Sequence, residues 1–394
     1  MLPCLLPQDL IYLKKISLRQ IKVGDICLVR FARKFSIHRV IYRNRRYFIS
    51  KGDNNPLSDG KLTAKNLIAK AYQVQRNGQT FDIDTLYLLQ SSLYLTEILK
   101  VKQLFEQNRI SYLFLKGLPL HLLFEGKLPR RVYADCDILI DKQEFSLVKK
   151  LFIKAGYHRA NFDLSDAHKR LRDKDPEISF IKTIKDFPVI FDIHLEAVFM
   201  MTQLGQLEAL YPQKLLDSYS QHLLDNKRMV KIQGEVYPIL GKEDLFIYLL
   251  LHLFHHNFRG AYRYDLILKV LRKGRLNWDV VEAILIRYRL ENFAYASLLL
   301  LCKYYQPKLP IQARLALARW KEGHRFVAER VLKEDIFSEE PRTSSGVKRF
   351  LYLFLLSPGA FLKKMFIFTS PAVLYSVFWT LGKLNWRAIG KNVP

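Results

Sequence analysis

Residues 131–140 read Arg-Val-Tyr-Ala-Asp-Cys-Asp-Ile-Leu-Ile, and this stretch decides the fold that we expect for the 394-residue chain. Asp135 and Asp137 lead into an apolar run with the composition of a buried β-strand. Side chains two residues apart on a strand point to the same face, so both carboxylates face one side of the sheet. Two like charges held in this way repel each other unless a cation joins them, which predicts a divalent metal site.

A third carboxylate comes from a second predicted strand. Asp192 is flanked by apolar residues within residues 189–194, on a strand that can lie beside the first. Three carboxylates on neighbouring strands can hold Mg²⁺ (or Mn²⁺), which polarises a phosphoryl group and activates an attacking hydroxyl. The pattern favours phosphoryl or nucleotidyl transfer. The alternative from these residues alone is that Asp135 caps a strand and Asp192 is a surface residue.

Outward from this stretch, hydrophobic spacing and turn residues predict an α+β chain with several units. Short strands separated by turns predict a small, mostly antiparallel β barrel or sandwich up to about residue 80. Helical spacing begins near residue 82 and continues to about residue 107, after which strands and helices alternate. The predicted units are a β domain (1–80), an α/β core (82–240), a helical subdomain (241–340) and a basic, apolar tail (341–394).

The charge of the chain is strongly basic and uneven. Lys and Arg number 63 against 37 Asp and Glu, giving a net charge of +26. Residues 1–80 carry a surplus of 12 positive charges, and residues 341–394 have 8 basic and no acidic side chains. Such ends favour anionic partners. Without a helix-turn-helix, RNP or zinc pattern, we predict no specific nucleic acid as a partner.

Cysteine spacing and the tail bear on localisation. Cys4, Cys27, Cys136 and Cys302 lie too far apart for a CxxC pattern, so we expect a reducing, cytoplasmic compartment. Residues 365–382 are uncharged, but they only reach the lower length limit for a spanning helix and Pro371 interrupts them. We therefore expect a buried or interfacial helix pair, with a spanning helix as the alternative, and the tail allows peripheral attachment at the inner face of the membrane.

Three motifs together resemble the uncharacterised nucleotidyltransferase family within the DNA polymerase beta superfamily. They are Leu115-Lys116-Gly117, then Arg131 followed by residues 135–140, and then Phe-Asp-Ile-His-Leu at residues 191–195. Members of the family show LKG, then R followed by DIDLLV, then a D/E-L-H-W stretch. The resemblance covers roughly residues 85–340, including the Leu-Phe-His-His run at residues 253–256.

This resemblance implies a polymerase-beta-like α/β core with a helical subdomain, and NTP as a substrate. By position, Asp135, Asp137 and Asp192 would be the catalytic metal ligands, and the triphosphate would be held by Lys116, Gly117 and Arg131. Gly117 departs from the superfamily's usual Gly-Ser turn, and Leu195 stands where the family often has Trp. We expect His255 and His256, within an apolar helix, to be packed core residues.

A second resemblance covers residues 1–80. Met-Leu-Pro-Cys-Leu at the start, Gly24-Asp25, His38-Arg39-Val40 and Lys-Gly-Asp-Asn-Asn at residues 51–55, followed by Asp59, look like the signal peptidase family of serine proteases. His38 matches the general base of that family, and Asp53 and Asp59 match the acids. The family's serine directly precedes the first motif's Met, which here is Met1. Either translation starts further upstream, or the domain has lost its chemistry and only binds.

The sequence therefore predicts a Mg²⁺-dependent nucleotidyltransferase that moves NMP from an NTP to an unidentified acceptor, such as a peptide or protein. Two alternatives stay open. One is a signal-peptidase-like serine endopeptidase whose start has been clipped. The other is a membrane-associated scaffold in which the β domain binds a peptide and the tail holds a membrane.

Overall fold

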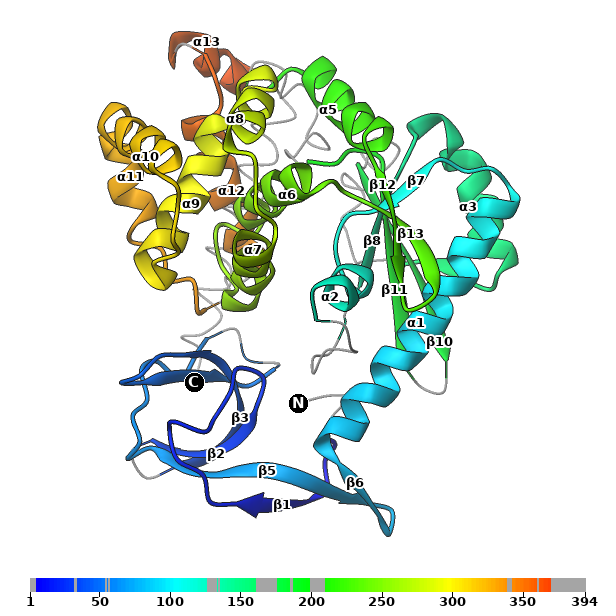
Figure 1. Cartoon of the computed structure of the whole chain (residues 1–394), viewed down its shortest axis with the longest axis vertical. Helices are drawn as coiled ribbons and strands as arrows, with labels where there is room; N and C mark the ends of the chain where they lie inside the picture. The colour runs from blue at the N-terminus through cyan, green and yellow to red at the C-terminus, as the bar shows by residue number, and fades with distance from the viewer. Residues whose placement is uncertain are drawn as a thin grey trace, which may run out of the picture.

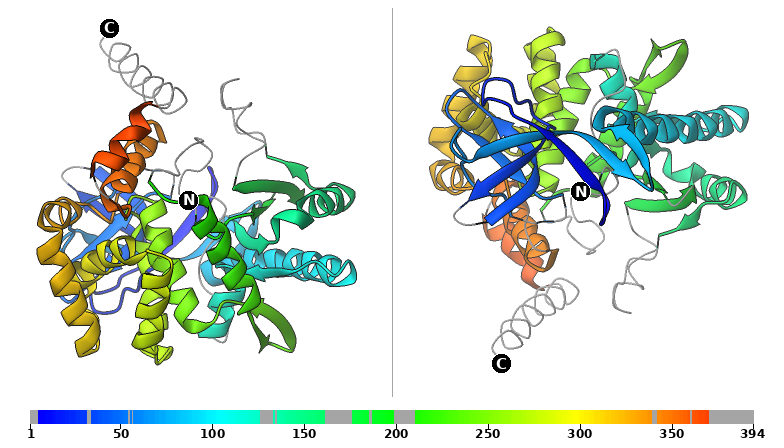
Figure 2. Two further views of the ribbon diagram at one scale, coloured as in Figure 1. Left: turned by 90° about the horizontal axis from the view of Figure 1, so that it is seen from above. Right: turned by 90° about the horizontal axis from the view of Figure 1, so that it is seen from below.

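The computed structural model describes residues 5–31, 34–53, 55, 57–125, 133, 135–160, 176–184, 187–198, 210–338, 342–359 and 361–369. This part of the chain forms two β-sheets and a group of helices (Figure 1). The N-terminal sheet lies at one end, and the second sheet and the helices lie side by side at the other (Figures 1 and 2). The mixed α+β class and the antiparallel N-terminal strands that the sequence predicted are confirmed.

The N-terminal sheet has apolar residues on both of its faces. Its order is β1-β5-β2-β3-β4, with β6 also pairing with β5, and every pairing is antiparallel. Ile26 and Cys27 are neighbours in β2, and they belong to two different hydrophobic clusters because successive side chains point to opposite faces. The strands are β1 (Leu10–Lys14), β2 (Ile26–Phe31), β3 (Lys34–Arg43), β4 (Phe48–Lys51), β5 (Leu67–Arg76) and β6 (Gln79–Asp82).

A long helix connects the two sheets. Helix α1 (Ile83–Gln107) follows β6 directly and runs along the second sheet (Figure 1). One stripe of the helix is buried, because residues such as Tyr94, Ile98 and Phe105 recur at helical spacing. The predicted boundaries near residues 80 and 240 lie next to the starts of α1 and α6, and as domain boundaries they stay a prediction.

The second sheet is mixed and has seven strands in the order β12-β13-β7-β8-β11-β10-β9. Its centre is β8 (Cys136–Ile140), in which every residue is buried. Strand β8 pairs with β11 (Phe187–His194) in parallel and with β7 (Tyr112–Phe114) in antiparallel fashion. The remaining strands are β9 (His158–Arg159), β10 (Glu177–Ile184), β12 (Arg228–Ile232) and β13 (Glu235–Ile239).

Helices surround this sheet and form the C-terminal half of the fold. Helix α2 (Leu118–Glu125) follows β7, a short 3₁₀ turn (Lys142–Glu144) and α3 (Phe145–Lys154) follow β8, and α5 (Gln213–Asp225) precedes β12. The central helix of the last group, α6, is buried along most of its length and contacts α7, α8 and α9. This group comprises α6 (Lys242–His255), α7 (Ala261–Lys273), α8 (Trp278–Arg287), α9 (Glu291–Tyr305), α10 (Ile311–Gly323), α11 (Arg325–Val331), α12 (Arg342–Leu356), α13 (Phe361–Met365) and a 3₁₀ turn (Phe366–Thr369).

The N-terminal sheet packs against the helical region. The Tyr42 hydroxyl donates to the carbonyl oxygen of Tyr304 at 3.3 Å, and the Tyr42 ring lies 5.0 Å from that of Phe337. The backbone N–H of Ser58 donates to the Ser338 hydroxyl at 3.4 Å. These contacts join residues more than 260 positions apart, so the β unit is docked on the helices as well as connected through α1.

Within the described part of the chain, no helix is both long enough and apolar enough to cross a membrane. Of the uncharged stretch at residues 365–382, only residues 365–369 are described, so most of the predicted tail helix pair lies outside the described residues.

Candidate functional site

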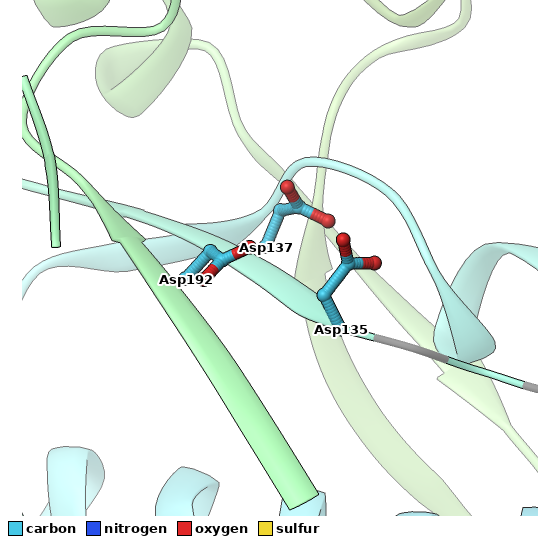
Figure 3. A group of neighbouring side chains, drawn as sticks. All are labelled: Asp135, Asp137 and Asp192. Carbon is cyan, nitrogen blue, oxygen red and sulfur yellow. The ribbon is translucent and has the colours of Figure 1, made fainter. Parts of the chain in front are cut away.

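The site begins with the two aspartates of the central strand. Asp137 is the second residue of β8, and Asp135 lies just before the strand. The apolar residues that follow Asp137 are fully buried in the sheet and fix the strand in place. The two aspartates lie at its N-terminal end. The two carboxylates share one face, as the spacing in the sequence predicted (Figure 3).

The parallel pairing of β8 with β11 brings the third aspartate to the first two. In this register Asp192 is the direct partner of Asp137. Carboxylate oxygens of Asp135, Asp137 and Asp192 all lie within 4.8 Å of one another (Figure 3). The convergence of the three predicted residues is therefore a property of the fold.

The Lys116-Gly117 turn lies against the same aspartates. The backbone N–H of Leu115 donates to the carbonyl oxygen of Asp137 at 3.0 Å, which extends the antiparallel pairing of β7 and β8. Gly117 has a φ of +99°, a backbone conformation that residues other than glycine rarely adopt. The Lys116 ammonium nitrogen Nζ lies 2.7 Å from Asp137 Oδ2 and 3.6 Å from Asp135 Oδ1.

His194 contacts the opposite oxygen of Asp137. Its Nε2 lies 3.0 Å from Asp137 Oδ1, and both side chains are buried. Burial by itself lowers the pKa of His194, but Glu177 and Asp137 nearby outweigh it and raise the pKa. For Asp137, burial raises the pKa, and Lys116 and His194 overcome this effect and lower it.

The negative charge of Asp192 is less well compensated by nearby cations than that of Asp137. Burial, together with the charges of Glu177, Asp137 and Asp135, raises the pKa of Asp192 to about 7. Among the described residues, its Oδ1 is buried and has no hydrogen-bond partner. A buried carboxylate oxygen without a donor is unfavourable unless a cation or proton reaches it.

These observations fit a divalent metal ion. Three carboxylates supply hard oxygen ligands, the type that Mg²⁺ and Mn²⁺ prefer, and within the described structure two of their buried oxygens, Asp137 Oδ2 and Asp192 Oδ1, have no hydrogen-bond partner. The cluster of Asp135, Asp137 and Asp192 can thus bind a metal, whose identity the residues do not determine.

Histidines of the helical region form the opposite wall of the pocket. The pocket that contains the three aspartates is also lined by Tyr248, in the middle of α6, and by His252, His255 and His256, at and just after its C-terminal end. Burial, aided by the positive charges of Lys116 and Arg263, lowers the pKa of His252 and His256. The expectation that His255 and His256 are merely packed core residues was wrong, because the end of α6 faces the carboxylates.

Sequence reasoning also passed over Glu177, Tyr248 and His252. Glu177 begins β10 and is paired in register with His194, and all three of these residues line the pocket. His252 lies three and four residues before His255 and His256, a spacing that places the three on one helix face. That spacing was the available signal. The predicted residue Arg131 lies outside the described residues.

The peptidase-like residues of the N-terminal sheet form a separate group. His38, on β3, places Nδ1 2.7 Å from Asp59 Oδ2, and the Ser50 hydroxyl donates to the same carboxylate oxygen at 2.6 Å. Asp53 instead accepts two hydrogen bonds from the Arg39 guanidinium, at 2.9 and 2.7 Å. The structure thus brings together His38 and Asp59, and it pairs Asp53 with an arginine.

The raised pKa of Asp192 predicts how stability depends on pH. Between about pH 4 and 7 the folded protein keeps a proton on Asp192 that the unfolded chain has released, so the free energy of unfolding falls as pH rises through this range. We expect Asp192→Asn to raise the free energy of unfolding at pH 8 by on the order of 1–3 kcal/mol, with little change at pH 4.5.

Urea unfolding in EDTA, followed by circular dichroism, measures this difference. Asp141→Asn is the matched control, because Asn replaces Asp as an N-cap with little cost and Asp141 caps the turn after β8. An equal effect of Asp192→Asn at the two pH values would contradict the assignment of the raised pKa to Asp192.

Comparison with known proteins places the chain in a family. The model of the uncharacterised nucleotidyltransferase family matches residues 85–306. No curated protein matches the chain. The antibiotic-resistance factor ANT(2'')-Ia has 11% identity and a TM-score of 0.32 over 50% of this chain and 92% of its own. An antigenic nucleotidyltransferase-like protein from Paracoccidioides brasiliensis has 12% identity and a TM-score of 0.30 over 64% of this chain and 94% of its own.

At these TM-scores the two solved structures carry no argument about substrate or mechanism. The family match covers more than half of the 394 residues and includes all three aspartates, Lys116 and Gly117. It implies a transferase that uses a nucleoside triphosphate. This chain belongs to the uncharacterised nucleotidyltransferase family.

Proposed function

We propose that the protein is a Mg²⁺- or Mn²⁺-dependent nucleotidyltransferase that transfers NMP from an NTP to an acceptor hydroxyl or phosphate. The observation that carries the proposal is the convergence of Asp135, Asp137 and Asp192 within 4.8 Å. A bound divalent ion would neutralise the phosphates and polarise the α-phosphoryl group. Asp135, Asp137 and Asp192 would hold it, which gives the three carboxylates a common function.

In this reaction the acceptor oxygen forms a bond to the α-phosphorus, and the bond from the α-phosphorus to the bridging oxygen breaks. Pyrophosphate leaves with the electron pair of that bond, and the acceptor's proton passes to a carboxylate or to water. We assign Lys116 and the backbone at Gly117 to the triphosphate, together with Arg131 from the family motif. Lys116 supports this role because its ammonium already lies in the pocket, between the aspartates and the histidines.

The acceptor is unidentified, and we propose a peptide or protein. The support is the peptidase-like unit on the same chain, which packs on the helical region through Tyr42 and Ser58. A polypeptide held by that unit is the simplest shared substrate of the two parts.

Removal of one metal ligand tests the transferase. We expect Asp137→Asn to lower transfer from α-labelled NTP by about 100-fold or more, because one of the three carboxylates that would hold the ion loses its charge. The assay screens the four NTPs with Mg²⁺ and Mn²⁺ and measures label on protein and peptide acceptors.

Asp141→Asn is the control, since this residue is four positions along the same segment and caps the next turn. It should retain full transfer. Undiminished labelling in Asp137→Asn, with its fold intact by circular dichroism, would refute the transferase proposal.

A second proposal concerns the N-terminal unit as a signal-peptidase-like endopeptidase. It is supported by the contact of His38 Nδ1 with Asp59, because a carboxylate at Nδ1 holds the proton there and leaves Nε2 to accept a proton from a nucleophile. His38 Nε2 faces Gly52, where a Cβ atom would lie only 3.1 Å away. A side chain at position 52 would therefore crowd the nitrogen that does the chemistry.

The nucleophile decides this second proposal. The gene should contain an in-frame serine codon directly before the codon of Met1, and a stop codon there would exclude the peptidase.

With that serine included, we expect His38→Ala to lower cleavage of a signal-peptide substrate about 1,000-fold or more. Asp59→Asn should impair cleavage more than Asp53→Asn, since Asp53 pairs with Arg39. His158→Ala, on β9 of the other sheet, is the control.

We propose that the C-terminal region attaches the protein peripherally to an anionic membrane surface, in keeping with a cytoplasmic location at its inner face. Phe361, Leu362 and Phe366 are 63%, 77% and 69% exposed, and Lys363 lies among them. Apolar and basic side chains side by side suit the boundary between headgroups and acyl chains.

Liposome flotation tests this attachment. We expect the protein to float with vesicles that contain phosphatidylserine, and the double variant Leu362→Glu/Phe366→Glu to stay in the soluble fraction. Ile311→Glu changes an equally apolar residue, 59% exposed, on α10 and should float like the unchanged protein. Flotation of the double variant at the unchanged level would rule out this surface.

A further inference from the structure

The Lys116 ammonium contacts carboxylate oxygens that a metal ion would need as ligands. Its Nζ lies 2.7 Å from Asp137 Oδ2 and 3.6 Å from Asp135 Oδ1. A Mg²⁺ ion binds carboxylate oxygen at about 2.1 Å, so an ammonium and an ion cannot both approach Asp137 Oδ2 closely. The two cations would also repel each other at such a separation. The metal and the lysine therefore compete for one ligand.

The ammonium is firmly held in this position. The Lys116 side chain is only 18% exposed and that of Asp137 is 4% exposed, so the pair is largely shielded from water. A lysine ammonium is charged at neutral pH, so its contact with the two carboxylates is an ion pair. An ion arriving alone has to displace this ammonium from the oxygen that it contacts.

Only the side chain of Lys116 is free to change its contacts. The backbone N–H of Leu115 donates to Asp137, and the carbonyl oxygen of Gly117 accepts from the N–H of His121 at 3.2 Å, so the turn is fixed on both sides. The flexible four-carbon stem of lysine can redirect its ammonium without moving the backbone.

A triphosphate is the partner that can draw the ammonium away. Lys116 already contacts Asp137 and Asp135, and the pocket is also lined by His252, His255 and His256, which carry no negative charge. A triphosphate brings several negative charges into this space and competes with the carboxylates for the ammonium.

From this geometry we infer that Lys116 is a competing cation: it holds Asp135 and Asp137 until a triphosphate draws its ammonium away, so that metal and nucleotide enter the site together. The inference rests on the metal site of the proposed function and adds its regulation. By thermodynamic linkage, metal and triphosphate each strengthen the other's binding by the same factor. The site then binds metal alone, or nucleotide alone, only weakly.

The test measures Mn²⁺ binding by calorimetry, without nucleotide, in the full chain and in Lys116→Met. Methionine keeps a straight apolar stem and removes the charge, so we expect the Kd for Mn²⁺ alone to become at least about tenfold tighter. Lys116→Arg keeps the charge and should bind Mn²⁺ within about threefold of the unchanged protein. Lys142→Met is the control, because Lys142 pairs with Glu196 and Asp217 outside this cluster.

A second arm measures coupling with tripolyphosphate as the probe, which avoids the unknown base. In the unchanged protein, tripolyphosphate should bind at least about tenfold more tightly with saturating Mn²⁺ than in EDTA, and Lys116→Met should lose most of this factor. If Lys116→Met is too unstable in EDTA for calorimetry, Lys116→Gln replaces it, and Mn²⁺ should raise its melting temperature more than that of the unchanged protein.

The outcomes separate this inference from the proposed function. If Mn²⁺ binds and Asp137→Asn abolishes binding, but Lys116→Met leaves the Kd unchanged or weaker, the metal site stands and the competing lysine is refuted. If Mn²⁺ binds neither the unchanged protein nor Lys116→Met, the metal site itself is refuted and the inference falls with it.

Discussion

The parallel pairing of β8 with β11 is the constraint on which the site depends. It sets Asp192 beside Asp137 in register, and adjacent strands lie only about 4.8 Å apart. With Asp135 two residues before Asp137, three acidic groups are forced together where the central strand β8 begins. Their mutual repulsion has to be offset by cations, and in this structure Lys116 and His194 contact the two oxygens of Asp137.

The rest of the fold holds this unfavourable group in place. Apolar residues of β8 are buried between β7 and β11, and the Lys116-Gly117 turn is tied to β8 through the backbone of Asp137. The pocket is also lined by His252, His255 and His256 at the end of α6, and burial together with nearby cations lowers the pKa of His252 and His256. The pocket thus combines carboxylates with Lys116 and a group of histidines, an arrangement suited to a polyanionic substrate.

In the N-terminal unit, as in the pocket, aspartates lie beside cationic groups or hydrogen-bond donors. The tertiary structure gives its two aspartates different partners. Asp59 contacts His38, and Asp53 binds the Arg39 guanidinium with two hydrogen bonds. The docking of this unit through Tyr42 and Ser58 onto the helical region brings the two halves of the chain into direct contact.

The sequence by itself determined which residues are candidates for the chemistry. The period of two along a strand put Asp135 and Asp137 on one face, and the motifs at Lys116 and Asp192 identified the family, because these are local properties of the chain. Only the tertiary structure decided that Asp192 pairs with Asp137, that Lys116 contacts Asp137, and that His255 and His256 line the pocket. Strand register and the direction of a helix face depend on contacts between distant segments, and neither spacing nor composition along the chain specifies those contacts.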